Sequence, residues 1–306
     1  MILNASGCLD ALTAPEVARS LDVFVTKTVT PLPRDGNAPP RIAETDAGML
    51  KSIGLANPGI AAFSQTLPRL AELGIPIWVS VGGFCAEDYA GVCAQLDGEA
   101  IVQAVELNLS CPNVAEPSAS TFEIIAAARA ATAKPLYAKL SASVPDLAAV
   151  ARASAEAGAH GLSLINTIRG LALDERTLRP RLSTATGGLS GPALKPVALA
   201  AVYACSKTVD LPIVGMGGVW TGRDALELIA AGASAVALGT VLFADPGAPA
   251  RIRSELTAEA AALGVENPLE LRGIAYAERK TIHSPDVDKP KATIGGKAPI
   301  STENPP

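Results

Sequence analysis

The feature that most constrains this chain is a regular alternation of short apolar runs with longer alanine-rich runs. The apolar runs predict strands at 2–4, 23–27, 77–81, 104–109, 136–140, 161–166, 213–215 and 235–238. The runs between them predict helices that include 14–21, 68–73, 88–96, 121–131, 146–157, 193–207 and 223–231. Strands that are apolar on both faces belong to a parallel sheet covered by helices. About eight strand–helix units therefore predict an α/β fold, a (β/α)8 TIM barrel, with a doubly wound open sheet as the alternative.

The length and composition suit one large folded unit. The chain has 306 residues, of which 49% are hydrophobic, enough to bury one barrel core or two smaller cores. We interpret residues 1–279 as a single barrel domain. From about residue 280 the sequence is polar and rich in Lys and Pro, so 280–306 is predicted to be a disordered tail.

Charge and composition disfavour several classes of protein. A formal net charge of -5 without a basic stripe argues against nucleic acid as a partner. No run approaches the roughly 20 apolar residues of a membrane span, and no signal peptide opens the chain. The five cysteines are dispersed without a CxxC pair, which is typical of reduced thiols and indicates a cytoplasmic protein. His160 and His283 lie far apart without ligand spacing, so no metal site is predicted.

Polar residues and glycines stand where the predicted strands end. They are Lys27, Ser80, Asn108, Lys139, Asn166, Gly217 and Gly239. A parallel barrel gathers these strand ends on one rim, so we expect the residues to converge there. The connections 28–61 and 168–189 are too long for ordinary turns and are predicted to be lids or substrate walls.

A cysteine between two carboxamides follows the strand predicted at 104–109. Pro112 cannot donate a hydrogen bond to a sheet, so Cys111 is expected on the loop that leaves the strand. Asn108 and Asn113 offer the paired donors and acceptors that suit an amide-rich ring such as a pyrimidine. A buried structural cysteine is the alternative interpretation.

Two glycine turns and one lysine point to an anion at the same rim. Residues 215–218 and 239–240 follow consecutive strands, and glycine lets backbone N–H groups approach phosphate oxygens closely. The helix that follows the first turn would add favourable partial charge. Tight turns without a ligand are the alternative. Lys139 ends an apolar strand, where an inward lysine needs an anionic partner, whereas a surface lysine needs none.

Taken together, these segments resemble the dihydroorotate dehydrogenase family, class 1, in which the base is a cysteine. The resemblance runs from about residue 2 to about residue 249 and rests on 26–28, 36–41, 48–59, 108–113, 138–140, 166–167, 187–196, 215–218 and 239–240. It implies FMN-dependent oxidation of (S)-dihydroorotate to orotate in pyrimidine (UMP) biosynthesis. Cys111 would remove a proton from C5 of the substrate while hydride passes from C6 to FMN.

The resemblance also implies the site residues. Expected around FMN are Ala5, Ser6, Gly7, Lys27, Thr28, Ser80, Asn108, Lys139, Ile165, Ser190, Gly191, Gly217, Gly218, Gly239 and Thr240. Expected around the substrate are Lys27, Lys51, Ile53, Gly54, Leu55, Asn108, Asn113, Asn166 and Thr167. Lys51 departs from the family pattern, which has asparagine there, and adds a cation where the substrate carboxylate is expected.

The resemblance is strongest to the class 1B catalytic subunits, through 48–50 and 187–196. It implies a homodimer and, for the class 1B type, an iron–sulfur flavoprotein subunit that passes electrons onward. Such iron–sulfur chemistry would come from another chain, because this chain has no cysteine cluster of its own. Two alternatives stay open. One is a related flavin barrel acting on another dihydropyrimidine, and the other is a catalytically silent barrel that binds FMN or a partner.

Overall fold

The computed structural model describes residues 1–109 and 120–277. One parallel sheet contains β1 (Ile2–Asn4), β2 (Phe24–Val25), β5 (Ile77–Val81), β6 (Val102–Asn108), β7 (Leu136–Leu140), β8 (Gly161–Leu164), β11 (Ile213–Met216) and β12 (Ala235–Leu238). Its order is β1-β12-β11-β8-β7-β6-β5-β2. A parallel bridge between Leu3 and Val23 brings the two edge strands together. The predicted barrel is therefore confirmed, and the open-sheet alternative is wrong.

The side chain of Asn4 reinforces the seam between the two edge strands. Its Oδ1 accepts a hydrogen bond from the backbone N–H of Val25 at 2.8 Å, and its Nδ2 donates to the Val25 carbonyl at 2.7 Å. Asn4 is fully buried, so both bonds are protected from water. The seam is held by a buried amide as well as by backbone pairing.

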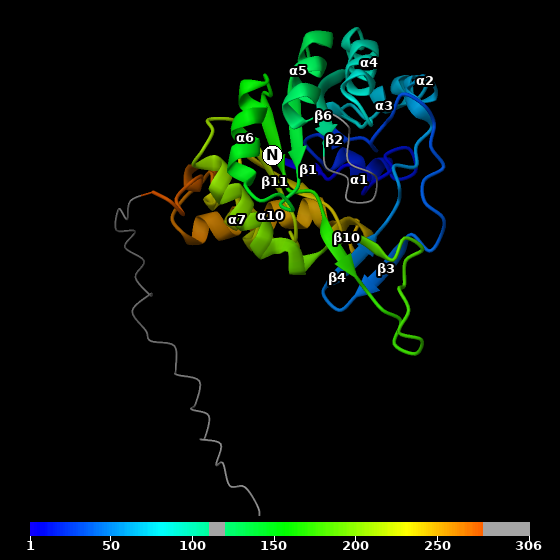
Figure 1. Cartoon of the computed structure of the whole chain (residues 1–306). Coiled ribbons are helices and arrows are strands. Elements are labelled where there is room, and N and C mark those ends of the chain that lie inside the picture. Colours follow the sequence, from blue (N-terminus) through cyan, green and yellow to red (C-terminus); the bar gives the residue numbers. More distant parts are fainter. Residues whose placement is uncertain (110–119, 278–306) are drawn as a thin grey trace, which may run out of the picture.

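Helices cover the outside of the barrel (Figure 1). They are α1 (Pro15–Arg19), α2 (Gly59–Ser64), α3 (Leu67–Ala71), α4 (Ala86–Asp97), α5 (Thr121–Ala131), α6 (Leu147–Glu156), α7 (Lys195–Ser206), α8 (Gly222–Ala230), α9 (Val241–Ala244) and α10 (Ala248–Ala262), with 3-10 turns at Pro192–Leu194 and Pro268–Leu271. The seven predicted helices are present, six of them with shifted ends and α5 with the predicted bounds, whereas α2, α9 and α10 were not among them. No described helix is both long and apolar enough to cross a membrane.

Side chains of the barrel strands alternate between the helices and the barrel interior. On β6, Val105 and Leu107 belong to the large core between strands and helices, whereas Ala104 belongs to the smaller cluster inside the barrel. Because strand side chains alternate with a period of two, Glu106 and Asn108 face inward with Ala104. The same alternation on β7 turns Lys139 inward.

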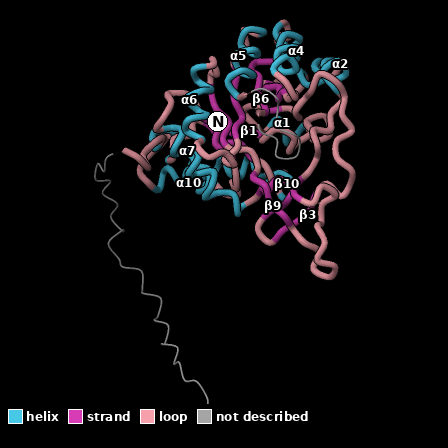
Figure 2. The backbone as a smooth tube through the Cα atoms, viewed as in Figure 1, coloured by secondary structure: helices cyan, strands magenta, loops and turns pink. Residues whose placement is uncertain are grey.

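A second sheet forms from the two long connections. It is antiparallel, with the order β3 (Ile42–Thr45), β4 (Gly48–Lys51), β10 (Thr186–Ser190) and β9 (Ile168–Leu171). Figures 1 and 2 show this small sheet to one side of the barrel. The sequence predicted lids or walls here but no strands. Gly191 allows the end of β10 to lie close to the start of β4, because a Cβ at that position would lie 2.5 Å from the Cα of Gly48.

Candidate active site

Two adjoining cavities open where the barrel strands end. The larger, of about 640 Å³, is called here the long cavity, and the smaller, of about 470 Å³, the polar pocket. Both are lined by Ser6, Lys51, Lys139, Asn166 and Thr167, which therefore form a shared wall. A ligand in one cavity would lie directly against a ligand in the other.

The long cavity contains most residues predicted to hold a cofactor. They are Ala5, Ser6, Lys139, Ile165, Ser190, Gly191, Gly217, Gly218, Gly239 and Thr240. The sequence did not predict the apolar lining, which includes Cys8, Met49, Leu194, Met216, Val219, Trp220 and Phe243. Because no charge or glycine pattern marks an apolar lining residue, only the fold reveals this set.

One end of the long cavity is made of glycine backbone. Gly217 and Gly218 have positive φ of 127° and 76°, and a Cβ on Gly218 would lie 2.6 Å from the backbone nitrogen of Lys195. Among the described residues, the N–H groups of Gly217, Gly218 and Thr240 donate to no other backbone group. Close backbone approach with available N–H donors is the arrangement that suits a phosphate group.

The start of helix α8 is not part of this anion site, contrary to the expectation from sequence. The Asp224 carboxylate accepts hydrogen bonds from the N–H groups of Trp220 and Thr221, at 2.9 and 2.8 Å. Gly222 N–H donates to Glu255 at 2.7 Å. Burial opposes ionisation of Asp224, but hydrogen bonds from Lys195 and from the helix end lower its pKa. The helix is capped by its own carboxylate and is closed to an anionic ligand.

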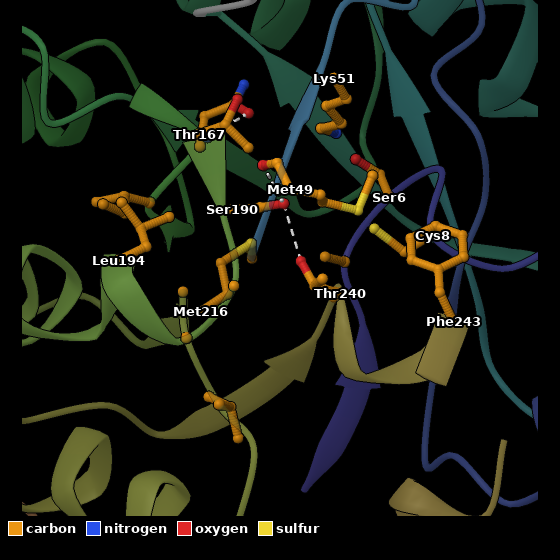
Figure 3. Close-up of a pocket in the computed structure, with 18 of the residues that line it drawn as sticks. Ser6, Cys8, Met49, Lys51, Thr167, Ser190, Leu194, Met216, Thr240 and Phe243 are labelled. Atoms are coloured by element: carbon orange, nitrogen blue, oxygen red, sulfur yellow. Dashed lines mark hydrogen bonds between the residues drawn. The ribbon is translucent and has the colours of Figure 1, made fainter. Parts of the chain in front are cut away.

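The middle of the long cavity has apolar faces. In Figure 3, Leu194 lies on one side of it, and Cys8 and Phe243 lie on the other. Between them, Thr240 Oγ1 donates to Ser190 Oγ at 2.8 Å. This pair joins the loop after β12 to the end of β10. A flat apolar ring system with one phosphate end fits this combination of lining and glycine turn.

The polar pocket contains the described residues predicted to hold a substrate. They are Lys27, Lys51, Ile53, Gly54, Leu55, Asn108, Asn166 and Thr167, and Thr28 joins them. Asn113, predicted with them, lies outside the described residues, as does the predicted catalytic residue Cys111. In the sequence, Cys111 follows Asn108, the last residue of β6, by three positions.

A chain of hydrogen bonds fixes the amides of this pocket. Ser80 Oγ contacts Thr28 Oγ1 at 3.0 Å, and Asn108 Nδ2 donates to the same Thr28 oxygen at 3.2 Å. Asn166 Nδ2 donates to Asn108 Oδ1 at 3.1 Å, and its Oδ1 accepts from Thr167 N–H at 2.8 Å. Four barrel strands are joined by this chain, which leaves the pocket preorganised for a flat polar ring.

Lys139 and Glu106 form a buried ion pair beneath the shared wall. Lys139 Nζ lies 3.3 Å from Glu106 Oε1, and their side chains are 5% and 2% exposed. Lys139 Nζ also donates to Ser6 Oγ at 2.9 Å. The sequence predicted an anionic partner for an inward lysine, but it did not identify Glu106. The glutamate stands in an apolar strand and is recognised only once the inward face is known.

Two predicted residues have more peripheral positions. Ser80 is fully buried and reaches the pocket only through Thr28. Gly7 lines neither cavity but leaves room for the Lys27 side chain, since an added Cβ on Gly7 would lie 3.3 Å from Lys27 Nζ. Gly7 lines a third, more open groove and Ser80 supports the polar pocket, and neither lines the long cavity.

Two of the remaining cysteines are poor candidates for a base. Cys93 and Cys205 are fully buried in the helix-facing core. Burial raises the pKa of each thiol to about 12. Neither forms a thiolate near neutral pH. The described residues also contain no group of three or more His, Cys, Asp or Glu side chains that could hold a metal ion.

Comparison with known proteins agrees with this geometry. The family profile described as dihydroorotate dehydrogenase matches residues 1–259. The chain belongs to the dihydroorotate dehydrogenase family. It is 44% identical over 289 residues to dihydroorotate dehydrogenase B (NAD(+)), catalytic subunit, of Desulforudis audaxviator, covering 90% of this chain and 93% of that protein. The predicted resemblance to class 1B catalytic subunits is confirmed.

Other family members show the range of relatives. The chain is 45% identical over 245 residues to a putative dihydroorotate dehydrogenase A (fumarate) of Solibacter usitatus, covering 78% of this chain and 81% of that protein. A crystal structure of DHODH from Eimeria tenella in complex with ferulenol superposes with a TM-score of 0.77 at 23% identity, covering 90% of this chain and 85% of the other. At that identity the superposition supports the fold alone.

Proposed function

We propose that this protein oxidises (S)-dihydroorotate to orotate, with FMN in the long cavity and the substrate in the polar pocket. The observation that carries the proposal is the shared wall, Ser6, Lys51, Lys139, Asn166 and Thr167, which places one cavity directly against the other. A hydride acceptor and a hydride donor must lie in contact, at about 3–3.5 Å between the reacting atoms.

The long cavity suits FMN at both of its ends. The N–H groups of Gly217, Gly218 and Thr240 would receive the phosphate, and the apolar side chains of Met49, Leu194 and Met216 would contact the ring. Lys139, held in the shared wall, would supply positive charge at the ring edge. Bound FMN would supply the hydride acceptor for the reaction.

The polar pocket would orient the substrate through amides. Asn108 and Asn166 already hydrogen-bond to each other, so the fold sets the orientation of both amides. Lys27 and Lys51 would face the substrate carboxylate. Cys111 would take the C5 proton. A free thiol has a pKa of about 8.5, so the small thiolate fraction present at neutral pH would accept that proton.

We also propose that electrons leave this chain through a partner subunit. Several relatives are named catalytic subunits of a B-type, NAD(+)-linked enzyme, which names one component of a larger assembly. An iron–sulfur flavoprotein is the chemical class we assign to that partner, with a homodimer of this chain at the centre.

Anaerobic titration of the purified protein tests the activity. We expect a yellow protein whose flavin bleaches with dihydroorotate, forms orotate in equal amount, and is released as FMN on denaturation. Bleaching by another dihydropyrimidine but not by dihydroorotate would reassign the substrate. A yellow protein that no dihydropyrimidine bleaches would support the silent-barrel alternative, and a protein that takes up no FMN would contradict the cofactor as well.

A further inference from the structure

Glu106 is a carboxylate buried inside the barrel, and the proposed reaction assigns it no part. It is 1% exposed and lies opposite Ser80 on β5 and Tyr137 on β7. The interior next to it is apolar, with the rings of Trp78 and Tyr137 at a centroid distance of 4.2 Å. Burying a charge in such surroundings is costly unless it is paired.

The charge of Glu106 is connected to the active site through a single side chain. Lys139 Nζ lies 3.3 Å from Glu106 and donates to Ser6 Oγ at 2.9 Å, and both Lys139 and Ser6 line the two cavities. The other buried carboxylate of the described chain, Asp224, is paired with Lys195 at the glycine end of the long cavity. Glu106 is therefore the buried counterion of the ammonium group in the shared wall.

Stability alone does not explain this pair. A buried ion pair is often no more stable than apolar residues of the same volume, whereas it fixes the positions of both side chains. Without Glu106, Lys139 would present an uncompensated positive charge to the long cavity through a medium of low dielectric constant. A charge in that place would favour any ligand that becomes more negative when reduced.

We propose that Glu106 is a positioning residue that holds the Lys139 ammonium in the shared wall and offsets its charge, and so lowers the reduction potential of the bound flavin. This inference rests on the proposed function only in that FMN occupies the long cavity. Lys139 attracts electrons to the ring and Glu106 limits that attraction. The chain thereby sets how readily the reduced cofactor passes its electrons on.

The test is the reduction potential of FMN-loaded Glu106→Gln, measured by dye equilibration with dithionite as reductant. We expect a rise of about 30 mV, equivalent to a tenfold shift for two electrons. Sulfite, which adds to oxidised flavin to give an anionic adduct, should bind about tenfold more tightly for the same electrostatic reason. Asp22→Asn is the matched control, since it removes a carboxylate paired with Arg253 at 2.9 Å next to the amino end of β2, and should change neither value.

An unchanged potential and unchanged sulfite affinity in Glu106→Gln would overturn the inference and leave a structural role only. If that variant does not fold, Glu106→Asp keeps the charge but withdraws it from Nζ, and the shift should have the same sign and a smaller size; no shift there also overturns the inference. Because dithionite replaces the substrate, a wild-type protein that binds FMN but ignores dihydroorotate would refute the proposed reaction alone. A wild type that binds no FMN refutes both.

Discussion

The two halves of the barrel wall build the site by different means. Strands β5 to β8 turn polar side chains inward, with Ser80, Glu106, Asn108 and Lys139 among them, and these residues are joined by hydrogen bonds or an ion pair. Strands β11, β12 and β1 turn small or apolar side chains inward and reach the site through backbone. One half can make specific contacts with functional groups, while the other leaves the space that a large ligand needs.

Because one half acts through side chains and the other through backbone, the two halves should respond differently to mutation. In the polar half, function resides in side-chain atoms that can be removed while the backbone stays in place. In the glycine half, backbone N–H groups would make the contacts. A substitution there would weaken ligand binding by adding side-chain atoms and not by removing them. Substitutions in both halves test this contrast.

The largest effect is expected for Cys111→Ala, three positions after the end of β6 in the sequence. Loss of a general base typically costs about 10²–10⁴-fold in rate. Flavin reduction by dihydroorotate, followed by stopped-flow absorbance, should fall accordingly, while FMN stays bound because the glycine half is unchanged. Cys111→Ser should retain a little activity shifted to higher pH, since a hydroxyl is a weaker acid than a thiol.

Cys93→Ala is the matched control for that prediction, because its thiol is buried away from both cavities. Equal rates of flavin reduction in wild type, Cys111→Ala and Cys111→Ser would show that another group is the base.

Removing one partner of the ion pair should strongly destabilise the protein without FMN. Lys139→Met leaves the Glu106 carboxylate buried and unpaired, and we expect a loss of about 3–5 kcal/mol in the free energy of unfolding. The double variant Glu106→Leu/Lys139→Met should recover most of that loss. Urea unfolding gives the free energy of unfolding of each variant. If the single and double variants lose the same amount, packing and not charge accounts for the loss.

In the glycine half, Gly218→Ala should disturb both the fold and FMN binding. Gly218 has a φ of 76°, and a Cβ would lie 2.6 Å from Lys195 N. We expect a cost of about 1–3 kcal/mol in stability and markedly weaker FMN binding in fluorescence titrations. Gly98→Ala is the control, because φ is -74° and a Cβ would meet nothing within 4 Å. Wild-type FMN affinity in Gly218→Ala would remove this turn from the cofactor site.

The smallest effect is expected for Lys51→Asn. Lys51 lies in the shared wall, and a charge contact there would contribute about 1.5–3 kcal/mol at most, less the entropy of a long stem. Orotate binding should become less dependent on salt, and turnover of dihydroorotate should stay equal or rise. Isothermal titration at two ionic strengths provides the comparison. If Lys51→Asn abolishes turnover, the lysine has a specific role and the substrate must be reconsidered.

The barrel strands could be predicted from sequence because each is buried on both faces and contains a short continuous apolar run. The small sheet could not, since β4 and β10 are short, contain Gly48, Gly187 and Gly188, and pair only after the barrel has brought distant segments together. β2 is also shorter than predicted, because only Phe24–Val25 pair regularly.

Some residues of the site could likewise be predicted from sequence and others could not. Residues at strand ends, such as Asn166 and Gly217, could be predicted because strand order alone brings them to one rim. Glu106 could not, since its role depends on which face of β6 is inward. The apolar lining from Met49 and Phe243 also depends on tertiary packing. The expected roles of Cys111 and Asn113 and the expected disorder of 280–306 stay predictions, because these residues lie outside the described ones.

The placement of Lys51 also sets it apart from the barrel strands. It stands on β4, in the sheet beside the barrel, and its backbone pairs with Ile42 and Gly188 rather than with any barrel strand. A side chain there can change without altering the strands that close the barrel or the seam at Asn4. The chemistry of the shared wall at position 51 is therefore separable from the stability of the barrel.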